Sequence, residues 1–216
     1  MTGPIVVINP NSTERITRQI RDAVSVLGGN LTVVTSPGGP PAIESDAEVA
    51  ASVLPLLATA EAHGRAAAYV VACFSDPGLD ELRRGRDAPS FGIAESALGA
   101  AISMAEQVGI VSSVEDSIPR HQRYWKRLGI EERVVADIAV GLGVLDLETE
   151  DAYERVEEAG ESLVRAGAGA VVLGCTGMTH MAERLQARLG VPVIDPCRAA
   201  VAAAMRAVID PTAGGP

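Results

Sequence analysis

The sequence is poor in positive charge and in aromatic side chains. Lysine occurs once, at Lys126, and 18 basic residues stand against 28 acidic ones, giving a formal net charge of −10 in 216 residues. Clustered Lys and Arg are what binds a phosphate backbone, so this charge balance argues against a nucleic-acid partner. A small-molecule substrate is the expected partner.

Long apolar runs and a leader are also lacking. We find no stretch of about 18 uncharged apolar residues, the length that a membrane span needs. The N-terminus MTGPIVVINP has neither a basic leader nor a small-residue cleavage site. We therefore predict no membrane partner and a cytoplasmic location.

Cysteine is scarce and widely spaced. The three cysteines, Cys73, Cys175 and Cys197, form no CxxC pair. An odd number at such spacing argues against a disulfide scaffold or a structural zinc site. A redox pair of Cys73 and Cys175 is disfavoured by the same spacing, and we expect no metal and no cofactor.

What the chain does contain is an alternation of strand and helix patterns. Apolar residues make up 47% of it, enough for an α/β core. The run IVVI at 5–8 predicts a strand, the amphipathic stretch 13–27 a helix, 31–36 a second strand, 46–62 a second helix and 67–72 a third strand.

One unit of this pattern occurs twice. AAYVVACFSDPGLDELRR around Cys73 matches GAVVLGCTGMTHMAERLQ around Cys175, and the two cysteines are 102 residues apart (175 minus 73). A similar offset relates IVVINPNS to VGIVSSVE and APSFGIAESAL to VPVIDPCRAAV. Three matched pairs in the same order indicate a tandem duplication.

The predicted fold is α/β, with two pseudo-symmetric, mainly parallel-sheet α/β/α halves facing each other across a cleft. We place the first half at 1–97 and the second at 98–198, and expect a closing helix at about 199–210 to pack back on the first half. Ligands of parallel sheets bind beyond the carboxyl ends of the strands. Both Cys73 and Cys175 fall there, at equivalent positions.

Two such cysteines facing one cleft suit a two-base proton transfer. One thiolate removes a proton from a carbon next to a carbonyl, and the opposite thiol protonates the other face, which inverts the centre. Both cysteines precede expected helix starts, whose free amides favour a thiolate or an enolate oxygen.

The chain resembles the aspartate/glutamate/hydantoin racemase superfamily over nearly its whole length. The motifs INPNS, ACFSDPGLD, FGIAESA, VLGCTGM and GVPVIDP stand in that superfamily's order and look most like hydantoin and allantoin racemases. The resemblance implies a cofactor-independent racemase with Cys73 and Cys175 as its acid/base pair, and a homo-oligomer. It also implies that the substrate is bound by Asn11, Phe74, Ser75, Thr176 and Gly177, and Ser112 and Ser113 take the place of the Asn-Pro-Asn turn in the second half.

Two positions depart from the hydantoin racemase pattern. Ser75 stands where those enzymes usually have Gly, and Thr176 stands where they usually have Ala. The GCTGM segment is in this respect more similar to the amino-acid racemases. The expected pocket segments carry no Lys or Arg, which favours a neutral ring over a dicarboxylate.

Racemisation of a 5-substituted hydantoin such as allantoin is therefore the leading hypothesis. The alternatives are an aspartate/glutamate-type racemase, a maleate cis/trans isomerase, in which one cysteine would add to the double bond, and a two-domain ligand-binding protein without catalysis. Arylmalonate decarboxylation is disfavoured because that chemistry resembles a one-cysteine design.

Three further side chains receive structural interpretations. His121 lies in the basic and aromatic segment PRHQRYWKRLG, which could meet an anionic substrate at the cleft mouth, but we favour a surface helix or a subunit contact for it. We expect His180 inside a helix and bound to no metal, and Cys197 as a buried structural thiol.

Overall fold

A computed structural model describes residues 3–210, and its first half is built on one parallel sheet. The strands are β1 (Ile5–Asn9), β2 (Leu31–Thr35), β3 (Ala68–Val71) and β4 (Ser90–Gly92), in the order β2-β1-β3-β4. β1 is buried along its whole length, as expected of a strand covered on both faces.

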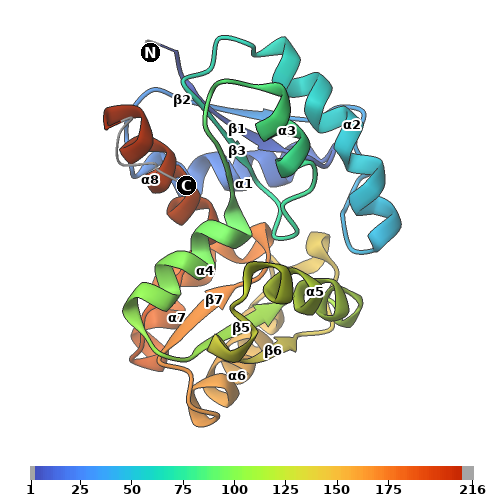
Figure 1. Cartoon of the computed structure of the whole chain (residues 1–216). Helices are drawn as coiled ribbons and strands as arrows, with labels where there is room; N and C mark the ends of the chain where they lie inside the picture. The colour runs from blue at the N-terminus through green and yellow to red at the C-terminus, as the bar shows by residue number, and fades with distance from the viewer. Residues whose placement is uncertain (1–2, 211–216) are drawn as a thin grey trace.

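The second half repeats this topology (Figure 1). Its strands are β5 (Val108–Ser112), β6 (Val134–Ala139), β7 (Ala170–Leu173) and β8 (Val193–Ile194), in the order β6-β5-β7-β8. In both halves the first strand lies between the second and third, and all pairs are parallel. The prediction of two like α/β units is confirmed.

Helices follow the strands in the same alternation. They are α1 (Glu14–Ser25), α2 (Asp46–Ala62), α3 (Leu79–Gly85), α4 (Ile93–Met104), α5 (Ile118–Leu128), α6 (Glu150–Arg165), α7 (Ala182–Leu189) and α8 (Pro196–Ile209). Short 3₁₀ turns lie at η1 (Glu115–Ser117), η2 (Glu131–Arg133), η3 (Val144–Asp146) and η4 (Thr176–Met181). None of the helices within 3–210 is long and apolar enough to cross a membrane.

Local sequence explains where several of these helices begin. Ser45 and Glu48 form a reciprocal capping box at the start of α2. At α8, the Asp195 carboxylate accepts from the amides of Cys197 and Arg198, and Pro196 occupies the first turn. Each cap satisfies amides that have no partner inside the helix.

Two helices join the halves. α4 leads from β4 of the first sheet to β5 of the second and lies between the two sheets in Figure 1. The last helix, α8, follows the second sheet but packs against α1, β1, β3 and β4 of the first half, and against α4. One hydrophobic core therefore continues from Val7 and Ile93 to Val111 and Leu173.

Candidate active site

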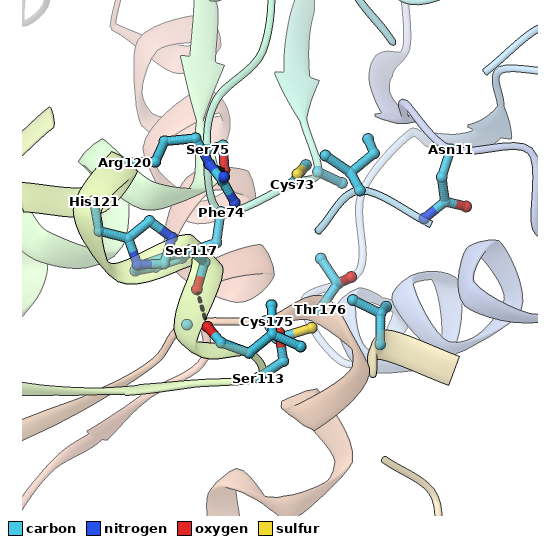
Figure 2. A pocket seen from close by; sticks show the side chains of 15 residues that line it. Asn11, Cys73, Phe74, Ser75, Ser113, Ser117, Arg120, His121, Cys175 and Thr176 are labelled. Carbon is cyan, nitrogen blue, oxygen red and sulfur yellow. Dashed lines mark hydrogen bonds between the residues drawn. The ribbon is translucent and has the colours of Figure 1, made fainter. Parts of the chain in front are cut away.

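A small pocket lies where the carboxyl ends of the two sheets meet (Figure 2). Its cavity volume is about 30 Å³. Its walls come from both halves and consist of Asn11, Ile43, Ala72, Cys73, Phe74, Ser75, Ser113, Val114, Ser117, Arg120, His121, Val144, Gly174, Cys175 and Thr176.

Cys73 and Cys175 occupy equivalent places in this pocket. Cys73 follows β3 and Cys175 follows β7, and Figure 2 shows them reaching the pocket from opposite sides. Cys73 is partly exposed and Cys175 is buried. Gly174 allows this approach, because a Cβ there would lie 2.8 Å from the Val111 carbonyl oxygen.

Burial makes both thiols weaker acids than a free cysteine. It raises the pKa of Cys73 to about 11 and that of Cys175 to about 12. Hydrogen bonds oppose this effect: the amide and hydroxyl of Ser75 lower the pKa of Cys73, and the Gly177 amide and Ser113 hydroxyl lower that of Cys175.

The expectation that α-helices start directly after both cysteines is wrong. After Cys73 the chain makes a turn, and α3 begins only at Leu79; after Cys175 the chain enters the 3₁₀ turn η4. Single amides of the two turns therefore take the place of a helix terminus. After Cys73 the reason is local, because Asp76 has a left-handed backbone (φ 45°), which interrupts a helix there.

Five of the predicted substrate-binding residues line the pocket, namely Asn11, Phe74, Ser75, Ser113 and Thr176. Asn11 is oriented by its neighbours. Its Oδ1 accepts from Asn9 Nδ2 at 2.8 Å and from the Thr13 amide at 2.9 Å. Figure 2 accordingly shows the Asn11 nitrogen turned toward the pocket, where it can donate to a ligand.

The other two predicted residues lie behind the wall. Ser112 is fully buried at the end of β5 and bonds to Asp137 and His121 instead of facing the cavity. The Gly177 amide lowers the pKa of Cys175, and a Cβ on Gly177 would lie 2.9 Å from the Leu147 side chain. Ser112 and Gly177, which we expected at the substrate, do not line this cavity.

His121 is a pocket residue, and the expectation that it lies on a surface helix or at a subunit contact is wrong. It is 2% exposed, its Nδ1 lies 2.8 Å from Asp137 Oδ2, and the Phe74 ring meets it edge-on with centroids 5.4 Å apart. Asp137 itself does not line the pocket, whereas His121 does. The signal was present in the sequence: His121, Tyr124 and Trp125 have helical spacing and form the buried face of α5.

Arg120 also lines the pocket, which corrects the expectation of a wall without Lys or Arg. Its side chain is 12% exposed, and its Nε donates to Ser75 Oγ at 2.9 Å. The argument for a neutral substrate from missing cations therefore no longer holds. The sequence could not reveal this contact, because Arg120 belongs to the second half and Ser75 to the first.

Asp76 connects the Cys73 turn with α4 and α5. Its carboxylate accepts from the amides of Ala94 and Glu95 at 3.0 Å each and from the Tyr124 hydroxyl at 2.7 Å. Burial nevertheless raises the pKa of Asp76 to about 7. Only glycine fits at position 92, since a Cβ there would lie 2.1 Å from the Asp76 carboxyl carbon.

The remaining candidate residues are structural or lie outside the pocket. Cys197 is fully buried in the first turn of α8, and burial raises its pKa well above the usual range. His180 is exposed within η4. Across residues 3–210, no three His, Cys, Asp or Glu side chains are grouped as metal ligands would be.

Comparison with known proteins identifies the family of this chain. The model of the Asp/Glu/Hydantoin racemase family matches residues 5–204. The chain belongs to this family. It is therefore an isomerase of the racemase class. A hydantoin racemase from Paenarthrobacter aurescens is 35% identical over 209 residues, which span 91% of this chain and 87% of that protein.

Solved structures show the same architecture. An allantoin racemase from Klebsiella pneumoniae superposes with a TM-score of 0.92 at 31% identity, covering 96% of this chain and 88% of that one. A glutamate racemase from Bacillus anthracis superposes with a TM-score of 0.73 at 17% identity, covering 98% and 83%, and shows the fold alone. The predicted resemblance to the superfamily and the predicted fold are confirmed.

Proposed function

We propose that this racemase inverts C5 of a 5-substituted hydantoin such as allantoin, using Cys73 and Cys175 as its two proton-transferring groups. The observation that carries the proposal is their position: each follows the same strand of its half, and both border one cavity from opposite sides. The hydantoin ring is suggested by what the relatives act on, a hydantoin racemase at 35% identity and an allantoin racemase at 31%.

The reaction needs a proton removed from one face of C5 and a proton returned to the other. The thiolate of one cysteine takes the C5 proton, breaking the C–H bond and leaving its electron pair on the C5–C4–O unit as an enolate. The thiol of the other cysteine then protonates C5 from the opposite face and becomes the thiolate. The charge of the pair is unchanged, and the site is ready for the reverse reaction.

The pocket offers donors for the negative charge that develops on the substrate oxygen. The Asn11 amide nitrogen faces the cavity, and the Thr176 side chain lines it. Oriented donors of this kind stabilise an oxyanion without reorganisation during the reaction. His121 also lines the pocket, and its Nδ1 lies 2.8 Å from Asp137 Oδ2, which orients the ring beside the substrate.

The test is proton exchange in deuterated water with separate single-enantiomer samples of allantoin and 5-benzylhydantoin. We expect the C5 proton signal and the optical rotation to decay together. Cys73→Ser and Cys175→Ser should each lower kcat/KM by about 10²–10⁴, because a hydroxyl is a far weaker acid and base than a thiol. The matched control is Cys197→Ser, which removes a thiol outside the pocket and should leave turnover in place.

Full activity of either pocket variant would sink the two-cysteine mechanism. Absence of exchange with both hydantoins would remove the substrate assignment while leaving the family membership intact.

One observation favours a second candidate, racemisation of aspartate or glutamate. Arg120 puts a guanidinium in the pocket wall, and Arg is well suited to bind a carboxylate. Three acceptors on the first half already engage it: Ser75, Asp46 and the Glu44 carbonyl. The same exchange experiment with L- and D-aspartate and glutamate decides between the two substrate classes.

A further inference from the structure

The two cysteines differ in the charges around them, although their positions in the fold are equivalent. On the Cys73 side, Ser75 lies two residues after Cys73 and lines the same cavity, and Arg120 Nε donates to Ser75 Oγ at 2.9 Å. Burial raises the pKa of Cys73, whereas Ser75 and Arg120 lower it. Because the Ser75 hydroxyl accepts from the guanidinium, its own proton is left to be donated to the neighbouring sulfur. A cation that polarises the hydroxyl favours negative charge on this sulfur.

The charged side chain that acts on Cys175 is the carboxylate of Glu44. Burial, the Cys73 sulfur and Glu44 raise the pKa of Cys175, whereas the Gly177 amide and the Ser113 hydroxyl lower it. Glu44 is held in place because its Oε1 accepts from the Val144 amide at 2.8 Å. A nearby carboxylate disfavours a second negative charge, so Cys175 is held as the thiol.

Arg120 is fixed on the Cys73 side. It starts from α5 in the second half, but its guanidinium also donates to Asp46 Oδ1 at 3.1 Å and to the Glu44 carbonyl at 3.5 Å, both in the first half. With only 12% of the side chain exposed, these contacts leave little freedom for it to turn toward Cys175.

We propose that Arg120, acting through Ser75, makes Cys73 the first cysteine to ionise, so that Cys73 is the base and Cys175 the acid in the free enzyme. This inference rests on the proposed two-cysteine mechanism. Arg120 is a positioning residue in it, and the free enzyme is poised for the enantiomer whose C5–H faces Cys73. The other enantiomer requires the proton to pass from Cys175 to Cys73 first.

The other titratable groups near the two sulfurs do not remove this asymmetry. Asp76 raises the pKa of Cys73, but its carboxylate is held by two amides and Tyr124. Cys197 interacts with both Cys73 and Cys175. His121 lines the cavity with its Nδ1 2.8 Å from Asp137 Oδ2, and burial raises the pKa of Cys73 and of Cys175 alike.

The test titrates each thiol alone in the full-length chain. Cys175→Ser with Cys197→Ser leaves only Cys73, and Cys73→Ser with Cys197→Ser leaves only Cys175. Thiolate is followed by its ultraviolet absorbance as pH rises, up to the pH at which circular dichroism reports unfolding. The variant with all three cysteines replaced by Ser provides the blank for tyrosine ionisation.

We expect Cys73 to ionise at lower pH than Cys175. Adding Arg120→Gln should move the midpoint of the Cys73 curve to higher pH. Below the midpoint, a rise of about one in the pKa lowers the thiolate fraction at fixed pH about tenfold. The same change should leave the Cys175 curve in place, and Arg120→Lys, which keeps the charge, should return the Cys73 midpoint part of the way.

Earlier ionisation of Cys175, or equal movement of both curves in Arg120→Gln, would overturn the proposal. If Arg120→Gln does not fold, Arg120→Lys and the comparison of the two single-thiol chains still decide the order of ionisation. The titration needs no turnover, so its failure is separate from failure of the proposed function, which the exchange experiment measures.

Discussion

Ser112, His121 and Asp137 form a chain of buried hydrogen bonds behind the pocket wall. Asp137 Oδ1 accepts from Ser112 Oγ at 2.5 Å, and Asp137 Oδ2 lies 2.8 Å from His121 Nδ1. A carboxylate on Nδ1 fixes which nitrogen of the ring carries the proton, and hence what Nε2 presents to a ligand. Asp137, which does not line the cavity, can thereby set the tautomer of His121, which does.

Replacing Asp137 by Asn should disturb both stability and turnover. The amide can accept from only one neighbour and must donate to the other, so the hydrogen bonds to a charged carboxylate are lost, at a cost of about 1.5–3 kcal/mol in unfolding free energy. The ring should change tautomer, which lowers kcat/KM. Urea unfolding and steady-state kinetics measure the two effects.

Asp116→Asn, an exposed position ahead of α5, is the control and should change neither quantity. Unchanged kinetics in Asp137→Asn would show that the His121 tautomer does not matter to turnover.

At the scale of elements, α4 takes its N-terminal cap from a turn that is distant in sequence. Gly92 has no side chain to cap the helix, and the Asp76 carboxylate, from the Cys73 turn, accepts from the amides of Ala94 and Glu95 instead. In the second half, Asp195 caps α8 directly from the equivalent end of its strand. The two halves therefore cap these helices with different residues, and the first half takes its cap from the turn that follows Cys73.

The Asp76 carboxyl should make stability fall as pH rises. Burial raises its pKa from 3.8 to about 7, so between these values the unfolded chain has lost a proton that the folded chain keeps. The unfolded state binds fewer protons there, so this contribution to the unfolding free energy is full at the acid end and is lost as pH rises through about 7. At about 1.4 kcal/mol per pH unit, the loss between about pH 5 and about pH 8 is on the order of 2 kcal/mol.

Urea unfolding of the wild type and Asp76→Asn at both pH values isolates this contribution. The stability of the wild type relative to the variant should decrease from the lower to the higher pH. A difference that does not change with pH would mean that Asp76 titrates normally in the fold.

For the whole molecule, the small cavity leads us to predict that the halves separate when a substrate binds. Its volume is about 30 Å³, whereas ligand pockets measure about 300–1,000 Å³. One set of contacts between the halves lies at Arg15 on α1, which donates to the Leu145 carbonyl at 2.7 Å and pairs with Glu148. We expect such contacts to break when the site opens.

Arg15→Ala should favour the open form. Pairs as exposed as Arg15 and Glu148 are worth roughly 0.2–1 kcal/mol, so the rate at which a small haloacetamide alkylates the pocket cysteines should rise by at most about fivefold. Mass spectrometry of alkylated Cys73 and Cys175 measures the effect. Arg155→Ala, which removes an ion pair within α6 alone, is the control; equal rates in both variants would argue against opening through these contacts.

Much of the fold could be predicted because it depends on neighbours in sequence. Apolar runs of β-branched residues, turn residues and helical periodicity are local properties, and the expected helix at 46–62 agrees with α2. The duplication extended this information: the matched cysteine segments placed Cys73 and Cys175 at equivalent strand ends, and topology then brought both to one pocket.

The sequence by itself thus determined the α/β class, the repeated strand-and-helix unit and the pair of strand-end cysteines. Tertiary structure decided the environment of that pair. Arg120 and His121 line the pocket because one face of α5 is turned toward the other half. Ser112 does not line the pocket, and its hydroxyl donates to Asp137. Burial and charge at the sulfurs depend on contacts between residues far apart in the chain, and no local pattern encodes them.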